Sequence, residues 1–218
     1  MEEQKIVCEG VEKLFSVPHI FGSEADFQFS LAWKMKEIYP DADIRLEYTP
    51  WDYDKKIRID LVIFINNKMI PIELKYKTRQ YSGTLGNEKI YLKNQSAQDS
   101  ARYDFIRDIY RLERITKSGI YPIEEAYAIF LTNDPLYWEP TNRLNTLDSE
   151  FRIHAGTKIH GEMNWKPGAS KGTIKSREEE LPVCGTYDIE WRSYKPREDC
   201  LFKYTIVEIK KEKLYKIR

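Results

Sequence analysis

The chain has 218 residues, 41% of them hydrophobic and 32% charged, and its 35 basic side chains balance 35 acidic ones. This composition is typical of a soluble globular protein, and a chain of this length can bury a sizeable core in a single domain. No run of about 18 apolar residues is present, which excludes an obvious membrane-spanning helix.

The first predicted element is a helix that begins after Ser23, an N-cap residue, and ends before Pro40. Residues 43–49 alternate apolar and polar side chains, as a half-exposed strand does. Residues 57–65 and 69–77 predict two further strands. The segment that follows, residues 80–93, contains two glycines, and we expect it to form a loop.

A long helix is predicted next, with Asn94 as its N-cap candidate and Gly119 as its stop. Residues 125–134 read as a buried strand that runs into an Asn-Asp-Pro turn. Beyond about residue 140 the pattern weakens until residues 201–217 predict a last strand. We therefore expect a single α/β domain over residues 1–218, with a core at about 20–135 and a C-terminal extension over 136–218 whose role is open.

The hairpin formed by the second and third strands carries two carboxylates in an otherwise apolar interior. If Asn66-Asn67 forms a two-residue primed turn, residues whose numbers sum to 133 face each other, so Asp60 lies opposite Glu73. The two residues make a non-hydrogen-bonded pair, with Cα atoms about 4.5 Å apart. One face of the hairpin is unbroken and apolar and is therefore the buried one; it carries Ile59, Leu61, Ile63, Ile65, Ile70, Ile72 and Leu74.

Two carboxylates this close repel each other unless one is protonated or a cation lies between them. Oxygen ligands favour Mg²⁺ or Mn²⁺ over zinc. Lys75 lies two residues beyond Glu73 on the same face, where its ammonium can reach a metal-bound water or a phosphate oxygen. The alternative is an ordinary amphipathic hairpin whose two acids are bridged by Arg58 on a solvent-exposed face.

Asp60, followed thirteen positions later by Glu73-Leu74-Lys75 and preceded there by Pro71-Ile72, resembles the PD-(D/E)xK nuclease superfamily. The resemblance covers about residues 20–135 and includes the order of helices and strands. It implies a restriction-endonuclease-like αβββαβ core, with a mixed central sheet flanked by helices, and a divalent-metal-dependent hydrolase that cleaves phosphodiester bonds. Residues 98–113 also look like a segment shared by uncharacterised bacterial members; the alternative for their charges is i,i+3 and i,i+4 surface pairing of Asp104, Asp108 and Glu113 with Arg107, Arg111 and Arg114.

The resemblance assigns roles to individual residues. It implies that Asp60 and Glu73 bind Mg²⁺ or Mn²⁺ and that Lys75 positions and activates water. The superfamily usually adds a glutamate from the first helix and often a glutamine from the second. Glu24 and Gln98 occupy these places, with Glu47 competing for the role of additional metal ligand and Gln95 as a less well placed rival of Gln98.

Charge is distributed unevenly along the chain. Residues 1–54 hold 5 basic and 12 acidic side chains, a net charge of −7, whereas residues 55–118 hold 14 and 7, a net charge of +7. The basic segment suits a polyanionic partner, although a solvated basic face would give the same count. The candidates for phosphate binding are Lys77, Arg79, Lys89, Lys93 and Arg102.

These features predict a nuclease that acts on nucleic acid, on DNA in preference to RNA, without a membrane partner. Three widely separated cysteines and an acidic N-terminus without an apolar signal core lead us to expect a cytoplasmic protein. The competing interpretation is a catalytically inactive module that binds nucleic acid or protein on the same fold. Strandedness, sequence specificity, biological role and oligomeric state, a homodimer included, stay open.

Overall fold

The computed structural model describes residues 5–143 and 145–211. Its centre is a six-stranded sheet with the strand order β1-β2-β3-β6-β10-β9. Neighbouring strands are antiparallel except β3 and β6, which run parallel. The strands of this sheet are β1 (Asp43–Tyr48), β2 (Ile59–Ile65), β3 (Lys68–Lys77), β6 (Glu125–Thr132), β9 (Arg192–Arg197) and β10 (Cys200–Lys210).

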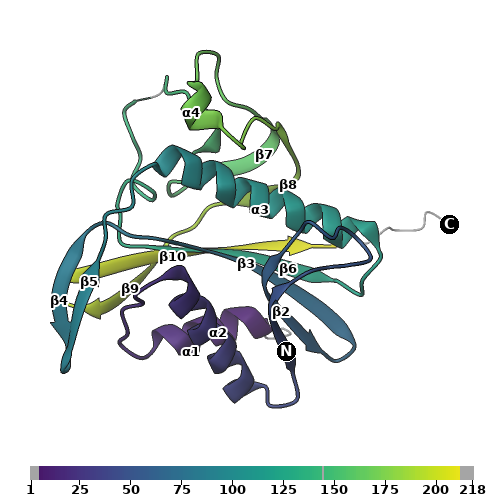
Figure 1. Ribbon diagram of the computed structural model, residues 1–218, viewed down its shortest axis with the longest axis vertical. Helices are drawn as coiled ribbons and strands as arrows, with labels where there is room; N and C mark the ends of the chain where they lie inside the picture. Colours follow the sequence, from purple (N-terminus) through teal and green to yellow (C-terminus); the bar gives the residue numbers. More distant parts are fainter. Residues whose placement is uncertain (1–4, 144, 212–218) are drawn as a thin grey trace.

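Helices cover both faces of the sheet. Helices α1 (Ile6–Phe15) and α2 (Glu24–Ile38) lie on one face and α3 (Gln98–Ser118) lies on the other (Figure 1). Each interface encloses its own apolar core. The predicted α/β architecture, a mixed central sheet flanked by helices, is therefore confirmed. None of the described helices is long and apolar enough to cross a bilayer.

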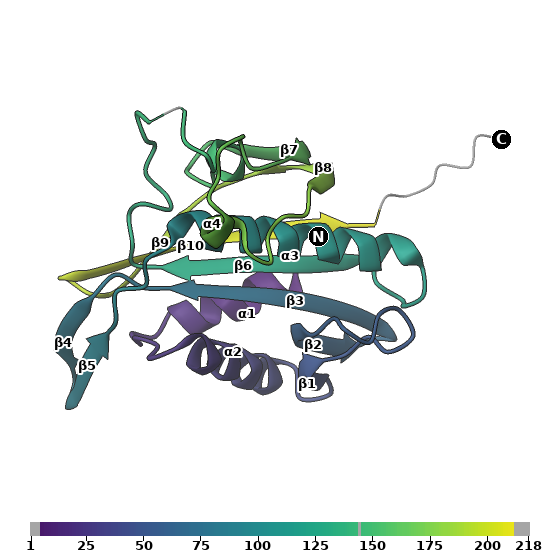
Figure 2. The ribbon, with the colours of Figure 1, turned by 45° about the horizontal axis from the view of Figure 1, so that its top comes forward.

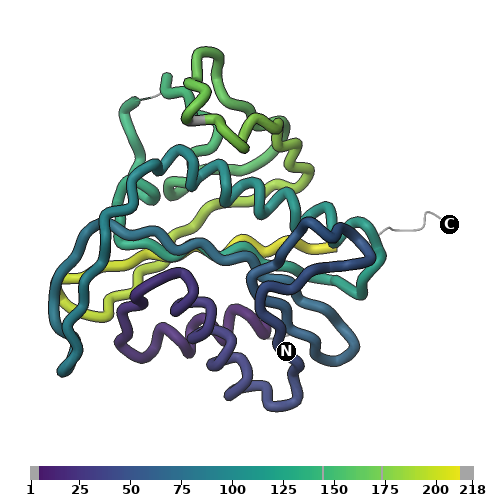
Figure 3. Tube along the Cα trace, viewed as in Figure 1, coloured from purple at the N-terminus to yellow at the C-terminus, as the bar shows by residue number. Residues whose placement is uncertain are grey.

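The segment between β6 and β9 forms a further layer over α3 (Figure 3). It contains a 3₁₀ helix (Ser149–Phe151), β7 (Lys158–Met163), α4 (Lys171–Ile174) and β8 (Leu181–Asp188). Strands β7 and β8 pair with each other, and their apolar side chains complete the core around α3. This layer was not predicted, because its apolar residues are scattered among charges and glycines. Helix α1 was missed although Val7, Val11 and Leu14 follow the helical period.

The predicted β2–β3 hairpin is confirmed. Asn66 and Asn67 have φ values of 51° and 58°, as a primed turn requires. The pairing runs from Ile65 with Lys68 to Leu61 with Ile72, in the predicted register. The buried face predicted from alternation packs beneath α1 and α2, with one exception.

Ile59 is that exception, and its predicted orientation is wrong. It packs on the α3 side of the sheet, with Val62, whereas Leu61 packs on the other side. The pairing of β2 with β3 ends at Leu61, and its pairing with β1 is interrupted at Asp60 and Glu47 before it resumes between Ile59 and Tyr48. Glu47 has a φ of 50°, so the backbone leaves the ideal strand path on both sides of Asp60.

Residues 80–93 form a β-hairpin, so the prediction of a loop is wrong. Strands β4 (Tyr81–Leu85) and β5 (Glu88–Leu92) pair around a turn at Gly86-Asn87, in which Gly86 has a φ of 58°. The period-two alternation of β5, in which Ile90 and Leu92 are buried, was the signal that indicated a strand. The hairpin extends from one end of the molecule (Figure 2).

Two predicted boundaries also change. Helix α3 begins at Gln98, after Ala97 with a φ of 70°, and not after Asn94, because residue 95 is bonded to the end of β3. The predicted last strand is β10, which ends at Lys210; the remainder of that pattern, residues 212–217, lies outside the described residues. Ser23, by contrast, caps α2 as predicted, accepting a hydrogen bond from the Asp26 amide.

Candidate active site

The site lies where β3 extends beyond the paired part of its neighbour β2. In an antiparallel ladder every second residue directs its N–H and C=O toward the partner strand. Beyond Ile72, β2 no longer supplies acceptors for the outward amides of β3. Side chains supply them: the Leu74 amide donates to Asp60 Oδ2 (2.6 Å), that of Tyr76 to Glu24 Oε2 (2.7 Å), and that of Thr78 to Gln95 Oε1 (2.8 Å).

The hydrogen bonds from the Leu74 and Tyr76 amides therefore bring Asp60 from β2 and Glu24 from α2 to the same open edge of β3. The backbone departure at Asp60 is part of this arrangement, because a continuing ladder would direct the Leu74 amide to the Ile59 carbonyl instead. The Asp60 amide in turn lies 3.5 Å from Glu73 Oε2. Asp60 and Glu73 thus lie close together, but through contacts between side chain and backbone; the facing pair predicted from the register is not formed, because the β2–β3 ladder ends at Leu61 and Ile72.

Glu73 and Lys75 point toward α3, where they meet two residues of that helix. Lys75 Nζ lies 3.0 Å from Asp108 Oδ2, and Arg111 Nη2 lies 2.9 Å from Glu73 Oε1. Arg111 Nη1 also lies 3.1 Å from Asp108 Oδ1, which closes the network. Glu73 is 4% exposed and Asp108 3% exposed, so these ion pairs are largely desolvated.

The β3 edge cluster, as we name it, contains four carboxylates and two cations: Glu24, Asp60, Glu73, Asp108, Lys75 and Arg111. With all groups ionised, negative charge exceeds positive charge by two. Burial raises the pKa of Asp60 to about 6, opposed by the Leu74 amide and reinforced by Asp108. Burial and the charge of Asp108 also raise the pKa of Glu73 well above its usual range, against the effect of Arg111.

Lys75 is held as a cation. Burial alone lowers its pKa, but the carboxylates of Asp108 and Glu24 outweigh burial, so the net pKa lies above the ordinary value. Its ammonium is therefore charged at neutral pH. Such a group donates hydrogen bonds and stabilises negative charge, and it does not accept a proton.

One pair in the cluster is incompletely satisfied. Although Arg111 Nη2 and Glu73 Oε1 are close enough for an ion pair, they are not aligned for a hydrogen bond, and Glu73 Oε1 is buried without a hydrogen-bond partner. Arg111 Nε is buried and unpartnered as well, while Nη2 also donates to the Arg58 carbonyl at 2.7 Å. A buried carboxylate oxygen without a hydrogen bond is costly, and a cation would satisfy it.

The residues present fit a hard divalent ion with few protein ligands. No group of three or more His, Cys, Asp or Glu side chains in the described part of the chain is arranged to hold a metal ion by itself. Mg²⁺ does not require such a cage, because it keeps several waters and commonly binds one or two carboxylates together with substrate phosphates. Asp60 and Glu73 provide two carboxylates, and the excess negative charge of the cluster favours a cation.

Glu24 and Glu47, the two candidates for an additional metal ligand, lie in different surroundings. Glu24 lies at the β3 edge, where its charge acts on both Asp60 and Lys75. Glu47 is exposed, and its carboxylate accepts a hydrogen bond from Gln28 Nε2 (3.1 Å), which also donates to the Asp60 carbonyl (2.5 Å). Gln28 therefore fixes the backbone of Asp60, a role that the sequence did not suggest.

Neither predicted glutamine bonds to a carboxylate of the cluster. Gln98 Nε2 donates to Asp134 Oδ2 (2.9 Å), just beyond the end of β6. Gln95 caps Thr78 at the end of β3. Both side chains thus join the start of α3 to the strand ends beside the site.

The basic candidates fall into two groups. Lys77 is half-buried on β3, while Arg79, Lys89 and Lys93 are exposed. Arg102 is 6% exposed and pairs with Asp148 (2.5 Å), so the prediction that it contacts phosphate is wrong. Its guanidinium fixes the loop after β6 through this ion pair and a bond to a backbone carbonyl.

The sequence did not identify Asp108 and Arg111 as site residues, because their spacing matched surface pairing along a helix. A signal was nevertheless present. Asp108 lies three residues after Phe105 and four before Leu112, and therefore within the apolar stripe that α3 buries. A carboxylate in that stripe indicates a buried partner.

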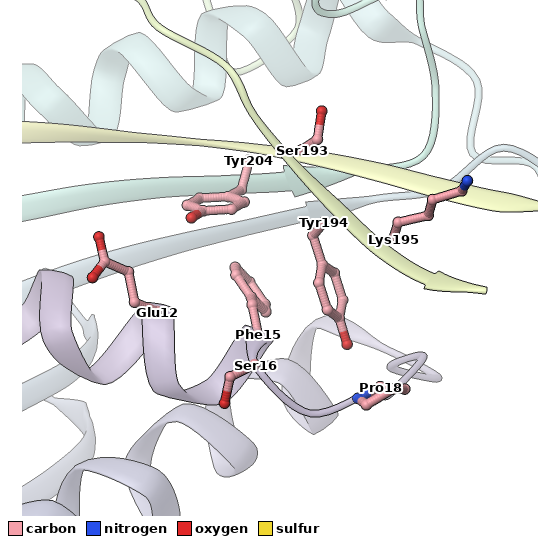
Figure 4. Close-up of a pocket in the computed structure, with 8 residues that line it drawn as sticks. All are labelled: Glu12, Phe15, Ser16, Pro18, Ser193, Tyr194, Lys195 and Tyr204. Atoms are coloured by element: carbon pink, nitrogen blue, oxygen red, sulfur yellow. The ribbon is translucent and has the colours of Figure 1, made fainter. Parts of the chain in front are cut away.

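A separate hollow lies away from the cluster. A pocket of about 280 Å³ opens between the end of α1 and strands β9 and β10, beside Tyr194 and Lys195 (Figure 4). No residue of the β3 edge cluster lines it. We place the candidate site at the cluster, because it has more carboxylates than cations and contains buried polar atoms without a hydrogen-bond partner, whereas none of the residues lining the pocket contains such an atom.

Comparison with protein-family models gives no match, and comparison with curated proteins likewise gives none. Functional inference therefore rests on the residues of the cluster and their geometry.

The raised pKa of Asp60 predicts a pH-dependent stability. Between its ordinary value of 3.8 and about 6, the folded protein binds a proton that the unfolded chain has lost, so the free energy of unfolding falls as pH rises through this range. The loss of stability that comes from ionising the buried Asp60 carboxyl is complete above about pH 6 and amounts to at most ~3 kcal/mol. We expect Asp60→Asn to stabilise the metal-free protein at about pH 8 and to have little effect at about pH 4.

Urea denaturation of both proteins in chelator, across this pH range, measures the difference directly. Asn keeps an acceptor for the Leu74 amide, so the comparison isolates the charge. A stability difference that does not change with pH would contradict the assigned cause.

Proposed function

We propose that the protein is a divalent-metal-dependent nuclease with a restriction-endonuclease-like core. The observation that carries this proposal is the convergence of Asp60, Glu73 and Lys75 at the open edge of β3, in a buried cluster with excess negative charge. The order α2, β1, β2, β3, α3, β6 and the parallel pairing of β3 with β6 agree with the core that the resemblance implies.

Asp60 and Glu73 would hold Mg²⁺ or Mn²⁺, with Glu24 as the additional carboxylate. The bound ion supplies Lewis acidity and stabilises charge on the phosphate. Lys75, charged and held by Asp108, donates a hydrogen bond that orients the attacking water and neutralises the developing negative charge. Lys77 and Arg79 follow along the same strand end and would contact phosphates of the bound strand.

A second candidate function is the non-catalytic binding module, and one observation favours it. Glu73 and Lys75 are each already paired with a residue of α3, so the cluster satisfies part of its own charge. In a nuclease these pairs must rearrange when metal and substrate bind. In a binding module they would stay as they are.

Cleavage of end-labelled double-stranded DNA, single-stranded DNA and RNA by the purified protein separates the two functions. We expect cutting with Mg²⁺ or Mn²⁺ that stops in chelator, with DNA as the preferred substrate. If metal and DNA both bind and no substrate is cut, the nuclease proposal fails and the binding module replaces it.

A further inference from the structure

The β4–β5 ribbon, residues 81–92, has two unlike faces. Residues that pair across the ribbon share a face, so one face carries Tyr81, Gly83, Leu85, Glu88, Ile90 and Leu92 and the alternate residues form the other. The apolar side chains of the first face pack on the core beneath α1 and α2, and Arg197, the last residue of β9, donates to the Thr84 carbonyl. The ribbon is thus supported on one side only.

The other face is exposed and carries no carboxylate. Ser82 and Thr84 on β4 lie opposite Tyr91 and Lys89 on β5, and Lys93 follows in the same alternation. Tyr91 is 62% exposed. Neither Lys89 nor Lys93 forms an ion pair with any carboxylate in the described ranges. Two unpaired ammonium groups, two hydroxyls and an exposed tyrosine ring form a surface of hydrogen-bond donors that complements a polyanion.

The ribbon is fixed directly to the strand that carries the candidate site. Thr78 follows β3 and is buried; its hydroxyl donates to the Lys93 carbonyl at 2.7 Å. Its amide and carbonyl also bond to the side chain and the amide of Gln95, each at 2.8 Å. Both ends of the ribbon are therefore held three residues beyond Lys75, which is about 10 Å along an extended chain.

We propose that this exposed face of the β4–β5 ribbon docks in the major groove of B-form duplex DNA that is bound at the β3 edge cluster. This inference rests on the proposed function, whose substrate it specifies. A two-stranded ribbon fits the major groove, which is about 12 Å wide, and strands of five residues reach about 17 Å, beyond the groove depth of about 8.5 Å. Lysine, serine and threonine donate to groove acceptors and phosphates.

The same geometry selects against other nucleic acids. The major groove of A-form RNA is deep and narrow and does not admit protein elements in this way. A single strand has no groove, and binding it requires aromatic side chains on which successive bases stack. The ribbon face offers one aromatic ring among hydroxyls and lysines. Duplex DNA is therefore the partner that this surface fits.

Fluorescence anisotropy in chelator tests the docking without chemistry, on labelled duplex DNA, duplex RNA and single-stranded DNA of one sequence. We expect the wild type to bind duplex DNA most tightly. Lys89→Ala/Lys93→Ala should weaken that binding at least about tenfold at low salt and flatten the slope of log K against log salt by about 2, because each phosphate contact contributes about 0.9. The matched control, Lys158→Ala/Lys210→Ala, removes two exposed lysines from β7 and β10 and should change affinity less than about twofold.

Protection of guanine N7 from methylation locates the contact, since N7 faces the major groove. The wild type should protect N7 positions that the ribbon variant leaves reactive. Equal duplex affinity of the two proteins, tighter binding of RNA or of single strands, or unprotected N7 would each overturn the docking. Cleavage assays distinguish a failure of this inference from a failure of the proposed function. If the wild type cuts DNA and the ribbon variant binds and cuts it equally well, only the docking proposal is rejected. If binding depends on the ribbon but neither protein cuts DNA, only the nuclease proposal is rejected.

Discussion

Lys75→Met should lower the rate of DNA cleavage by about 10²–10⁴-fold, the range that a positioned group acting on water or on developing charge contributes. Methionine keeps the apolar stem that lies among buried neighbours and removes the ammonium. Because Asp108 loses its partner, we also expect a moderate loss of stability, and urea denaturation verifies that the variant remains folded under assay conditions. Metal binding should persist, since Asp60 and Glu73 are unchanged.

Lys77→Met is the matched control for this variant. Lys77 lies two residues further along β3 on the same face, but it forms no ion pair with a carboxylate among residues 5–143 and 145–211. Its loss should weaken DNA binding and leave the rate at saturating protein within a few-fold of wild type. Single-turnover cleavage measures both rates. Similar losses in the two variants would mean that Lys75 contributes only charge, and an unchanged rate in Lys75→Met would remove it from the mechanism.

Arg111→Met should destabilise the metal-free protein by about 2 kcal/mol. Removing one partner of a buried ion pair costs roughly 3–5 kcal/mol, and we reduce this figure because the Arg111 side chain is 26% exposed. The loss arises from Glu73, which is left without a counter-charge, and from Asp108, which loses the hydrogen bond from Arg111 and keeps only Lys75. Mn²⁺ or Mg²⁺ should restore stability and bind the variant about tenfold more tightly than the wild type, in which the ion competes with Arg111 for Glu73.

Thermal denaturation with and without metal, together with calorimetric titration of Mn²⁺, measures both effects. Arg107→Met is the control, because Arg107 pairs with Asp104 one turn earlier on the same helix and away from the cluster. The double variant Glu73→Gln/Arg111→Met should recover much of the lost stability and lose the metal effect. Equal metal affinity in Arg111→Met and the wild type would show that Arg111 does not occupy the place of a metal ion.

The part of the site that lies in one hairpin could be predicted from the sequence. Asn66-Asn67 and the alternation of branched apolar residues fix the register as far as Leu61 and Ile72, and that register predicts Asp60 close to Glu73 with Lys75 on the same face. The structure adds a reason for the position of the site: β3 continues where β2 stops, and carboxylates from β2 and α2 cap the free amides.

Contacts between distant elements could not be predicted in the same way. The pairing of Asp108 and Arg111 with β3 depends on how α3 crosses the sheet, which a local pattern does not encode. Arg102 appeared available for phosphate because its partner, Asp148, lies in a loop without regular periodicity. The ribbon was missed because Gly83 and Gly86 suggested a loop, although the alternation of β5 indicated a strand.

Cleavage of duplex DNA in Mg²⁺ by wild type, Asp60→Asn and Glu73→Gln, purified in parallel, tests whether the two carboxylates hold a catalytic metal ion. Both substitutions remove a charge and keep the shape of the side chain, so folding is preserved while the proposed metal site is not. We expect metal-dependent cutting by the wild type alone. Equal cutting by all three proteins, or none by a wild type that binds both Mg²⁺ and DNA, would contradict it.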